Sequence, residues 1–441
     1  MNLLLYLLDT HGNESQLRSF LSGFCDNSHQ IIVVCESRQD EQLLNNIDNC
    51  KIIKVFYAYE FNTSFCSDAI GYDHLLVPRY IYKIEKKRFE CQSKVTDTVN
   101  NLITFFKRVL DEYEINACHF CAIGGVFRSV GVVVLQEVAT REKINTSLAF
   151  NTPIKGRFLV YEGIFFKSNQ FDRVYDQFLL NKPSLNKVNE LAIYFDKYLR
   201  FKNDTHVPFM SHRRDINFNW LKSAKLLIIK SLLSIGNKRR KKIDIHSGRP
   251  YILFLLSKNN HWYNSYANPE LLDRESVIKS IWRSIPQGYD LVLKTHPHIK
   301  SEHRIEYIIS NMQDCYLDYS DYTTTELVKN CSIVISSGTT AGVEALMQKK
   351  HVIEIGKNPA YFGFANPPVT LVTNINNMQI AIKKCLLTEP PLEKINAYFL
   401  ALLQISINNT KNTSEIDIYR DDIFYELMGE ESIKHINKLF L

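Results

Sequence analysis

The fold of this chain is decided by the stretch Ile333-Val334-Ile335-Ser336-Ser337-Gly338-Thr339-Thr340-Ala341-Gly342. An apolar run that ends in small, hydroxyl-bearing residues and continues into a helix-forming segment predicts a buried strand, a tight turn and a helix N-terminus. Unpaired backbone N–H groups and the positive end of the helix dipole point into such a turn. The stretch therefore predicts a phosphate site at the end of a strand.

Four hydroxyl side chains surround Gly338 in this turn, from Ser336, Ser337, Thr339 and Thr340. The turn contains no Lys and does not match the P-loop pattern, which favours a phosphate ester held by hydroxyls over a nucleoside triphosphate with magnesium. An ordinary capped turn would use the same residue types, because Ser and Thr are favoured helix caps.

A second motif, Lys294-Thr295-His296-Pro297, ends the apolar run that begins at Asp290. A near-neutral imidazole at a strand end can donate a hydrogen bond to a phosphate or protonate a leaving oxygen. Pro297 holds the backbone of His296 extended. The alternative is an ordinary surface-loop histidine, with Lys294 as a weaker companion.

Apolar runs alternate with helical patterns in both halves of the chain, which is typical of parallel strands joined by helical crossovers. We predict strands at residues 3–8, 31–35, 52–56, 117–122, 158–161, 251–256, 290–294, 315–317, 333–336 and 351–355, and a helix at 268–285 between two of them. The predicted fold class is α/β, with two Rossmann-like, doubly wound domains facing a central cleft and C-terminal helices. We predict an N-terminal domain at 1–203, a linker with a basic amphipathic helix at 204–250, a second domain at 251–420 and a closing helix at 421–441 that packs back on the core.

The composition excludes several classes of protein. A net charge of +6 over 441 residues is too mild for a nucleic-acid binder. The apolar start, Leu3–Leu8, is a predicted strand and not a signal peptide, and no stretch has the length of a membrane span. We expect a cytoplasmic protein. The basic cluster Lys238–Lys242 could dock on the anionic inner membrane, or could simply be a solvated linker.

Two carboxylates are candidate functional groups. Glu162 ends a predicted strand of the first domain and precedes Gly163, which allows a sharp turn, so it is a candidate general base. A Glu-Gly pair is more often an ordinary turn. Glu344 lies in the first turns of the helix that follows the hydroxyl-rich turn, where it could bind a ribose diol or complement the helix dipole.

Four segments of the chain together resemble the bacterial capsular polysaccharide synthesis family of glycosyltransferases, which includes β-Kdo transferases. The family is more distantly similar to bacterial sialyltransferases. The segments are Tyr161-Glu162-Gly163 with Phe166-Lys167-Ser168, Lys294-Thr295-His296-Pro297, Ser336-Ser337-Gly338-Thr339-Thr340 with Gly342 and Glu344-Ala345-Leu346, and Lys349-Lys350-His351-Val352-Ile353 with Gly356 and Tyr361. The family usually has a second acid where this chain has Tyr161.

The resemblance implies a GT-B arrangement and a CMP-sugar donor. Glu162 would deprotonate the acceptor, and His296 would bind the donor phosphate and help CMP to leave. The phosphate would also be held by the turn, and Glu344 would contact the ribose. Lys294 and Pro297 would complete the nucleotide site. No metal and no cofactor besides the donor substrate is implied, because hydroxyls, helix dipole and imidazole can absorb the leaving charge.

The expected function is therefore transfer of a 2-keto sugar acid, of the Kdo or sialic acid type, to an oligosaccharide or glycolipid acceptor in capsule or lipopolysaccharide synthesis. Two alternatives stay open at this point. One is a transferase that uses another donor, such as CDP-glycerol or a UDP-sugar. The other is a non-catalytic nucleotide-binding scaffold of an export complex.

Overall fold

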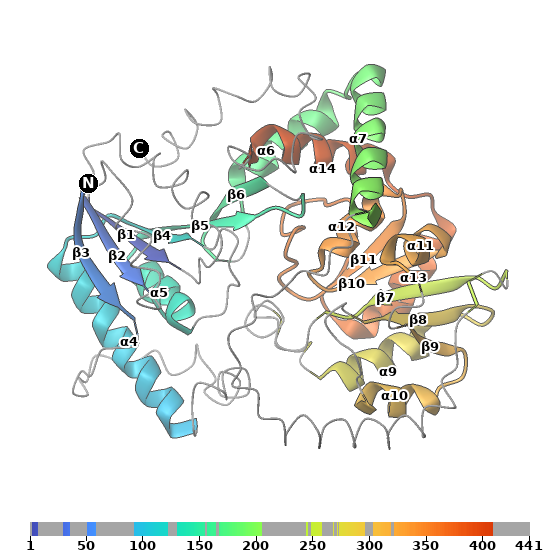
Figure 1. Ribbon diagram of the computed structural model, residues 1–441, viewed down its shortest axis with the longest axis horizontal. Coiled ribbons are helices and arrows are strands. Elements are labelled where there is room, and N and C mark those ends of the chain that lie inside the picture. Colours follow the sequence, from blue (N-terminus) through green and yellow to red (C-terminus); the bar gives the residue numbers. More distant parts are fainter. Residues whose placement is uncertain are drawn as a thin grey trace.

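Figure 1 shows the computed structural model of the chain. The structure describes residues 2–7, 30–35, 51–58, 92–121, 130–154, 157–164, 167–204, 244–245, 248–257, 268, 271, 273–295, 303–318 and 322–408. The predicted closing helix at 421–441 and the basic cluster Lys238–Lys242 lie outside these residues.

The first sheet has the strand order β13-β6-β5-β4-β1-β2-β3. Its strands are β1 (Asn2–Leu7), β2 (Gln30–Cys35), β3 (Ile52–Tyr57), β4 (Ala117–Cys121), β5 (Asn145–Asn151), β6 (Arg157–Glu162) and β13 (Ile407–Asn408). The strands β3, β2, β1, β4 and β5 pair in parallel, and β6 then pairs antiparallel with β5. The long helices α4 (Gln92–Glu112) and α5 (Val130–Arg141) supply the crossovers that parallel strands require.

The second sheet is parallel throughout, in the order β12-β11-β10-β7-β8-β9. Its strands are β7 (Tyr251–Leu255), β8 (Asp290–Lys294), β9 (Cys315–Asp318), β10 (Ile333–Ser336), β11 (His351–Ile355) and β12 (Thr370–Val372). The order reverses between β7 and β10, as it does at the switch point of a doubly wound fold. Ligands bind in such sheets at the carboxyl ends of the strands beside this point.

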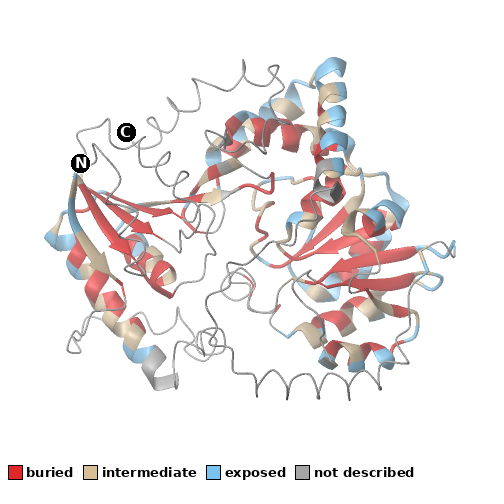
Figure 2. Cartoon of the chain, in the orientation of Figure 1, coloured by how far each residue is buried: buried red, intermediate tan, exposed pale blue. Residues whose placement is uncertain are grey.

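The central strands of both sheets are buried on both faces, which explains their near-continuous apolar sequences (Figure 2). The edge strands β3 and β12 are partly exposed. One face of the second sheet packs on α9 (Arg274–Ser284), α10 (His303–Ser310) and α13 (Met378–Leu387). The other face belongs to a larger core that includes α12 (Thr340–Met347) and extends to the first domain. The predicted fold class, two doubly wound α/β domains, is confirmed.

Three helices join the two sheets on one side of the molecule: α6 (Asn169–Leu180), α7 (Leu185–Asp204) and α14 (Leu392–Ile405) (Figure 1). The rings of Phe195 in α7 and Phe399 in α14 lie 4.6 Å apart, and β13 follows α14 to pair with β6 of the first sheet. The tyrosine hydroxyl of Tyr175 in α6 donates to the carbonyl of Asn366, 3.0 Å away in the second half of the chain. The chain thus returns to its first domain at 392–408.

Several element predictions need correction. The strand β5 was not predicted, because its sequence is polar at both ends, and β6 is antiparallel to its neighbour and not part of a parallel crossover. The helix predicted from Asn268 begins at Arg274, after the cap Asp273. Asn268 is buried instead. Its side-chain oxygen accepts a hydrogen bond from the backbone N–H of Asn358 at 2.9 Å, and its side-chain NH₂ donates to the carbonyl of Asn358 at 3.0 Å.

Candidate functional site

The hydroxyl-rich turn connects β10 to α12 at the switch point of the second sheet. Ser336 and Ser337 are buried, while Gly338 and Thr339 are half-buried and Thr340 is exposed. Gly338 has a φ of 63°, a left-handed conformation that favours glycine. The Thr339 hydroxyl caps α12 by accepting from the N–H of Gly342 at 3.2 Å, and it lies 2.9 Å from the Ser336 hydroxyl. The structure therefore brings the predicted hydroxyls together at a helix N-terminus.

Gly342 lets the helix approach the strand that precedes it. A Cβ atom at this position would lie 2.5 Å from Oγ and 2.8 Å from Cβ of Ser336. Ser336 cannot move away easily, because it is fully buried at the end of β10. The glycine is thus required by the close contact between helix and strand, and it fixes where the hydroxyls lie.

We expect Gly342→Ala to destabilise the protein by about 1–3 kcal/mol, the usual cost of overpacking a buried contact. Urea unfolding monitored by circular dichroism measures the change as a shift of the midpoint. A Ser336→Gly, Gly342→Ala double variant removes both clashing atoms and should recover part of the loss. An unchanged midpoint in Gly342→Ala would show that a Cβ atom at position 342 is accommodated without a clash with Ser336.

Lys294 lies at the carboxyl end of β8 and is buried. Its ammonium forms an ion pair with Asp318 at the end of β9, at 2.5 Å, and donates to the carbonyl of Tyr322 at 2.8 Å. The positive charge of Lys294, which we predicted to bind a phosphate, is therefore paired with the carboxylate of Asp318. The phosphate role of Lys294 stays a prediction. His296 and Pro297 lie outside the described residues.

Glu344 is buried in the second turn of α12, with 3% of its surface exposed. The predicted ribose contact needs an open carboxylate, and this carboxylate lies on the packed side of the helix. The ribose role stays a prediction.

Glu162 ends β6 and is exposed. Its carboxylate accepts hydrogen bonds from the backbone N–H of Asn169 at 3.1 Å and from the Asn169 side-chain amide at 2.6 Å. Its own N–H donates to the carbonyl of Lys167 at 2.7 Å, which closes the turn around Gly163 (φ 69°). The carboxylate is thus held in one orientation by neutral donors, as a general base requires.

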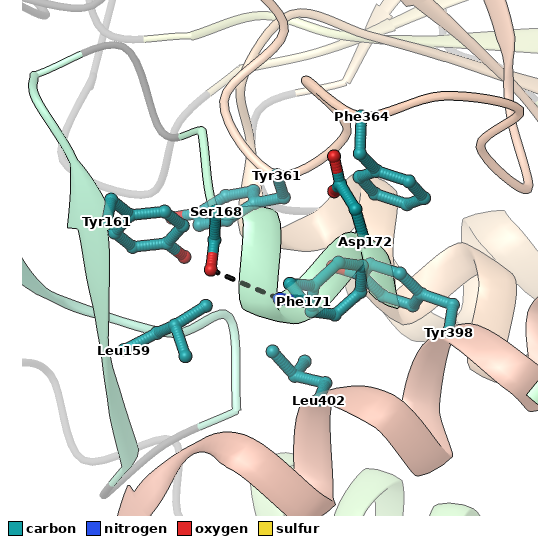
Figure 3. Close-up of a pocket in the computed structure, with 9 residues that line it drawn as sticks. All are labelled: Leu159, Tyr161, Ser168, Phe171, Asp172, Tyr361, Phe364, Tyr398 and Leu402. Carbon is teal, nitrogen blue, oxygen red and sulfur yellow. Dashed lines mark hydrogen bonds between the residues drawn. The ribbon is translucent and has the colours of Figure 1, made fainter. Parts of the chain in front are cut away.

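A small cavity lies beside Tyr161, the neighbour of Glu162, between β6, α6, α14 and the loop after β11 (Figure 3). Tyr161, Tyr361 and Tyr398 line it together with Asp172. Burial and the nearby carboxylates of Asp176 and Glu162 raise the pKa of Asp172, and one of its oxygens has no hydrogen-bond partner among the described residues. Asp172 therefore places a second acid close to Glu162, although Tyr161 replaces the acid expected in sequence.

Buried tyrosines connect the two halves of the site. Burial raises the pKa of Tyr361 and of Tyr398, and the charge of Glu354 in β11 raises both further. Tyr398 also interacts with Tyr161, the neighbour of Glu162. These tyrosines therefore lie between Glu354 of the second sheet and Tyr161 of the first.

Sequence reasoning missed Glu354, Asp172 and Asp318. Glu354 could have been found, because it is a lone charged residue near the end of a predicted apolar strand, as Lys294 is. Asp172 was not found, because its approach to Glu162 depends on the hydrogen bonds that tie Asn169, at the start of α6, to the Glu162 carboxylate. Asp318 directly follows the short strand predicted at 315–317, and it was not considered as a functional residue.

Among the described residues, no group of acidic, histidine and cysteine side chains has the arrangement of a metal site. Cys118 and Cys121 are buried in β4. In the part of the chain that the structure describes, no helix is both long enough and apolar enough to cross a membrane.

Comparison with known proteins gives one family match. The model of the family described as capsule polysaccharide biosynthesis protein matches residues 185–371. This segment contains the hydroxyl-rich turn, the His296 motif and Glu354. The resemblance inferred from the motifs is confirmed there, whereas Glu162 lies outside the match. No curated protein matches the chain.

Several solved structures are similar at low identity. One is KpsC of Thermosulfurimonas dismutans, a β-Kdo 2,4 transferase, with 11% identity over 64% of this chain and 79% of that chain, at a TM-score of 0.36. The β-Kdo 2,7 transferase of the same KpsC has 14% identity over 76% and 89%, at 0.38. A UDP-GlcNAc 2-epimerase of Neisseria meningitidis has 11% identity over 91% and 98%, at 0.31. Similarities of this size carry no conclusion about activity.

Proposed function

We propose that this chain is a glycosyltransferase of capsule synthesis, because its residues 185–371 match the model of the family described as capsule polysaccharide biosynthesis protein. The proposed donor is a CMP-activated 2-keto sugar acid of the Kdo or sialic acid type, and the proposed acceptor is an oligosaccharide or glycolipid. The observation that carries the proposal is the turn between β10 and α12. It gathers hydroxyls and helix N–H groups at the switch point of a doubly wound sheet.

In the proposed reaction, an acceptor hydroxyl attacks the anomeric carbon of the donor sugar while the bond from this carbon to the phosphate oxygen breaks. Glu162 takes the proton of the attacking hydroxyl. The electron pair of the broken bond leaves with CMP, and its charge is stabilised by hydroxyls of Ser336, Ser337, Thr339 and Thr340 and by the dipole of α12. His296 is the proposed donor to the leaving phosphate. The mechanism assigns no metal and no cofactor.

We further propose that the reaction takes place in the cytoplasm, on the inner face of the membrane that assembles the polysaccharide. The basic cluster Lys238–Lys242 supports a peripheral contact with anionic lipid, since clusters of Lys and Arg favour such surfaces. No nucleic-acid partner is proposed.

Calorimetric measurements of nucleotide binding test which nucleotide the donor carries. We expect CMP to bind more tightly than UDP or CDP, and a Thr339→Ala, Ser336→Ala double variant to lose most of the CMP affinity. Binding of UDP without CMP would overturn the CMP-sugar proposal in favour of another donor. Tight CMP binding without transfer to any saccharide acceptor would favour the scaffold alternative.

A further inference from the structure

Glu354 is a charged residue in the buried part of β11, where its neighbours Val352, Ile353 and Ile355 are apolar. It lies in β11 directly beside Ser336 of β10 in the sheet register, and only 1% of its surface is exposed. Placing a carboxylate in this environment is costly unless it is hydrogen-bonded or neutral. The sequence could have used an aliphatic residue here, as at Ile353 and Ile355.

The carboxylate binds the same groups that a phosphate would need. Oε1 of Glu354 accepts a hydrogen bond from the backbone N–H of Gly338, and the Ser336 hydroxyl also hydrogen-bonds to the carboxylate. Both donors belong to the hydroxyl-rich turn. Oε2 is buried and has no hydrogen-bond partner among the described residues. Glu354 thus holds the turn with one oxygen and keeps the other beside it without a partner.

The groups that face Glu354 do not neutralise it. Gly338 and Ser336 reach it from the turn, Tyr361 from the loop after β11, and Tyr398 from α14. Burial raises the pKa of Glu354 to about 7, while the hydrogen bonds from Gly338 and Ser336 oppose this rise. No cation among the described residues contributes to the balance. The carboxyl can therefore gain or lose its proton near neutral pH.

We propose that Glu354 takes up a proton when the phosphate of the nucleotide donor enters the turn, so that donor binding is coupled to protonation of this side chain. The inference rests on the proposed function, because it needs an anion in the turn. An ionised Glu354 and a phosphate would compete for the Gly338 N–H and repel each other in a buried environment. A neutral carboxyl removes the repulsion and accepts more weakly, which frees the N–H for the phosphate.

The sign of the pH effect follows from linkage. The phosphate raises the pKa of Glu354 above its value in the free protein, so binding takes up a proton. The affinity is then full below the free-state pKa and decreases by up to about tenfold per pH unit above it, as expected for one proton. Glu354 is a positioning residue in this scheme, because it acts through the turn.

The test uses the methyl ester of CMP, a phosphodiester whose own charge is constant across neutral pH. Affinity is measured by calorimetry between pH 6 and 8.5, in two buffers with different ionisation enthalpies, which counts the protons taken up by the wild-type protein. We expect the wild-type protein to take up close to one proton per bound ligand above pH 7. Its affinity for the ligand should decrease correspondingly as the pH rises. Glu354→Gln should bind with an affinity that does not change over this range, and Glu393→Gln, which removes an exposed carboxylate, should behave as wild type.

The outcomes separate the inference from the proposed function. Binding of the CMP ester with no proton uptake and no pH dependence overturns the role of Glu354 and leaves the donor proposal intact. A pH dependence that persists in Glu354→Gln also overturns it. If the CMP ester does not bind but UDP methyl ester binds with the same proton uptake, the donor assignment is wrong and the inference stands. The His296 imidazole would also take up a proton beside a phosphate, so the count is repeated in His296→Asn. Proton uptake that remains in this variant supports Glu354, even if Glu354→Gln does not fold. Loss of the uptake in His296→Asn assigns the proton to the imidazole and overturns the role of Glu354.

Discussion

Replacing Glu162 by Gln is expected to lower the rate of sugar transfer about 10²–10⁴-fold, the range that a positioned general base contributes. The amide keeps the size of the side chain and an oxygen that can accept from Asn169, but it cannot take a proton from the acceptor. Because Glu162 lies in the first domain and the hydroxyl-rich turn in the second, we expect nucleotide affinity to stay at the wild-type level. Initial transfer rates and calorimetric nucleotide affinities measure the two effects separately.

Glu112→Gln is the matched control, since Glu112 is an exposed carboxylate at the end of α4 whose partner is the exposed Arg108. It should transfer at the wild-type rate. Wild-type activity in Glu162→Gln would exclude Glu162 as the base and direct attention to Asp172, whose pKa is raised by burial and by its two acidic neighbours. Loss of both binding and transfer would instead indicate that the turn around Gly163 had been disrupted.

The strand and turn chemistry of the second domain could be predicted because it is local. An apolar run that ends in Ser336 and a helix that begins after Thr339 are visible in the sequence, and the structure places both as expected. The strand order that places this turn at the switch point was not predicted and comes from the structure. The glycine at 342 was noted as part of a motif, and the structure supplies its reason, a close contact with Ser336.

The parts that escaped prediction depend on contacts between distant segments. The position of α6 itself depends on its packing against α14 and against the loop that carries Phe364, where the rings of Phe171 and Phe364 lie 4.8 Å apart. Asn268 was predicted to lie in a helix. In the structure, its side chain instead forms hydrogen bonds with the backbone of Asn358. Neither role leaves a periodic pattern, so neither is visible without the folded chain.

The ion pair between Lys294 and Asp318 gives the second large effect, this time on stability. We expect Asp318→Asn to destabilise the protein by about 3–5 kcal/mol, because the change leaves a buried ammonium without its counter-charge. Side-chain exposure is 8% for Lys294 and 0% for Asp318, so water cannot replace the lost partner. Chemical denaturation followed by circular dichroism measures the change in the free energy of unfolding. A loss of less than 1 kcal/mol, the usual size for an exposed pair, would show that the pair is solvated.

The double variant Lys294→Met, Asp318→Leu separates structure from ligand binding. Replacing both partners of a buried pair by apolar residues is often neutral or stabilising, so this variant should be more stable than Asp318→Asn. If the only role of Lys294 is to join the ends of β8 and β9, where it lies beside Asp318 in the register, the folded double variant should bind CMP as tightly as the wild type. A loss of CMP affinity in a folded double variant would show that the ammonium leaves Asp318 to reach the phosphate, as the sequence motif predicts.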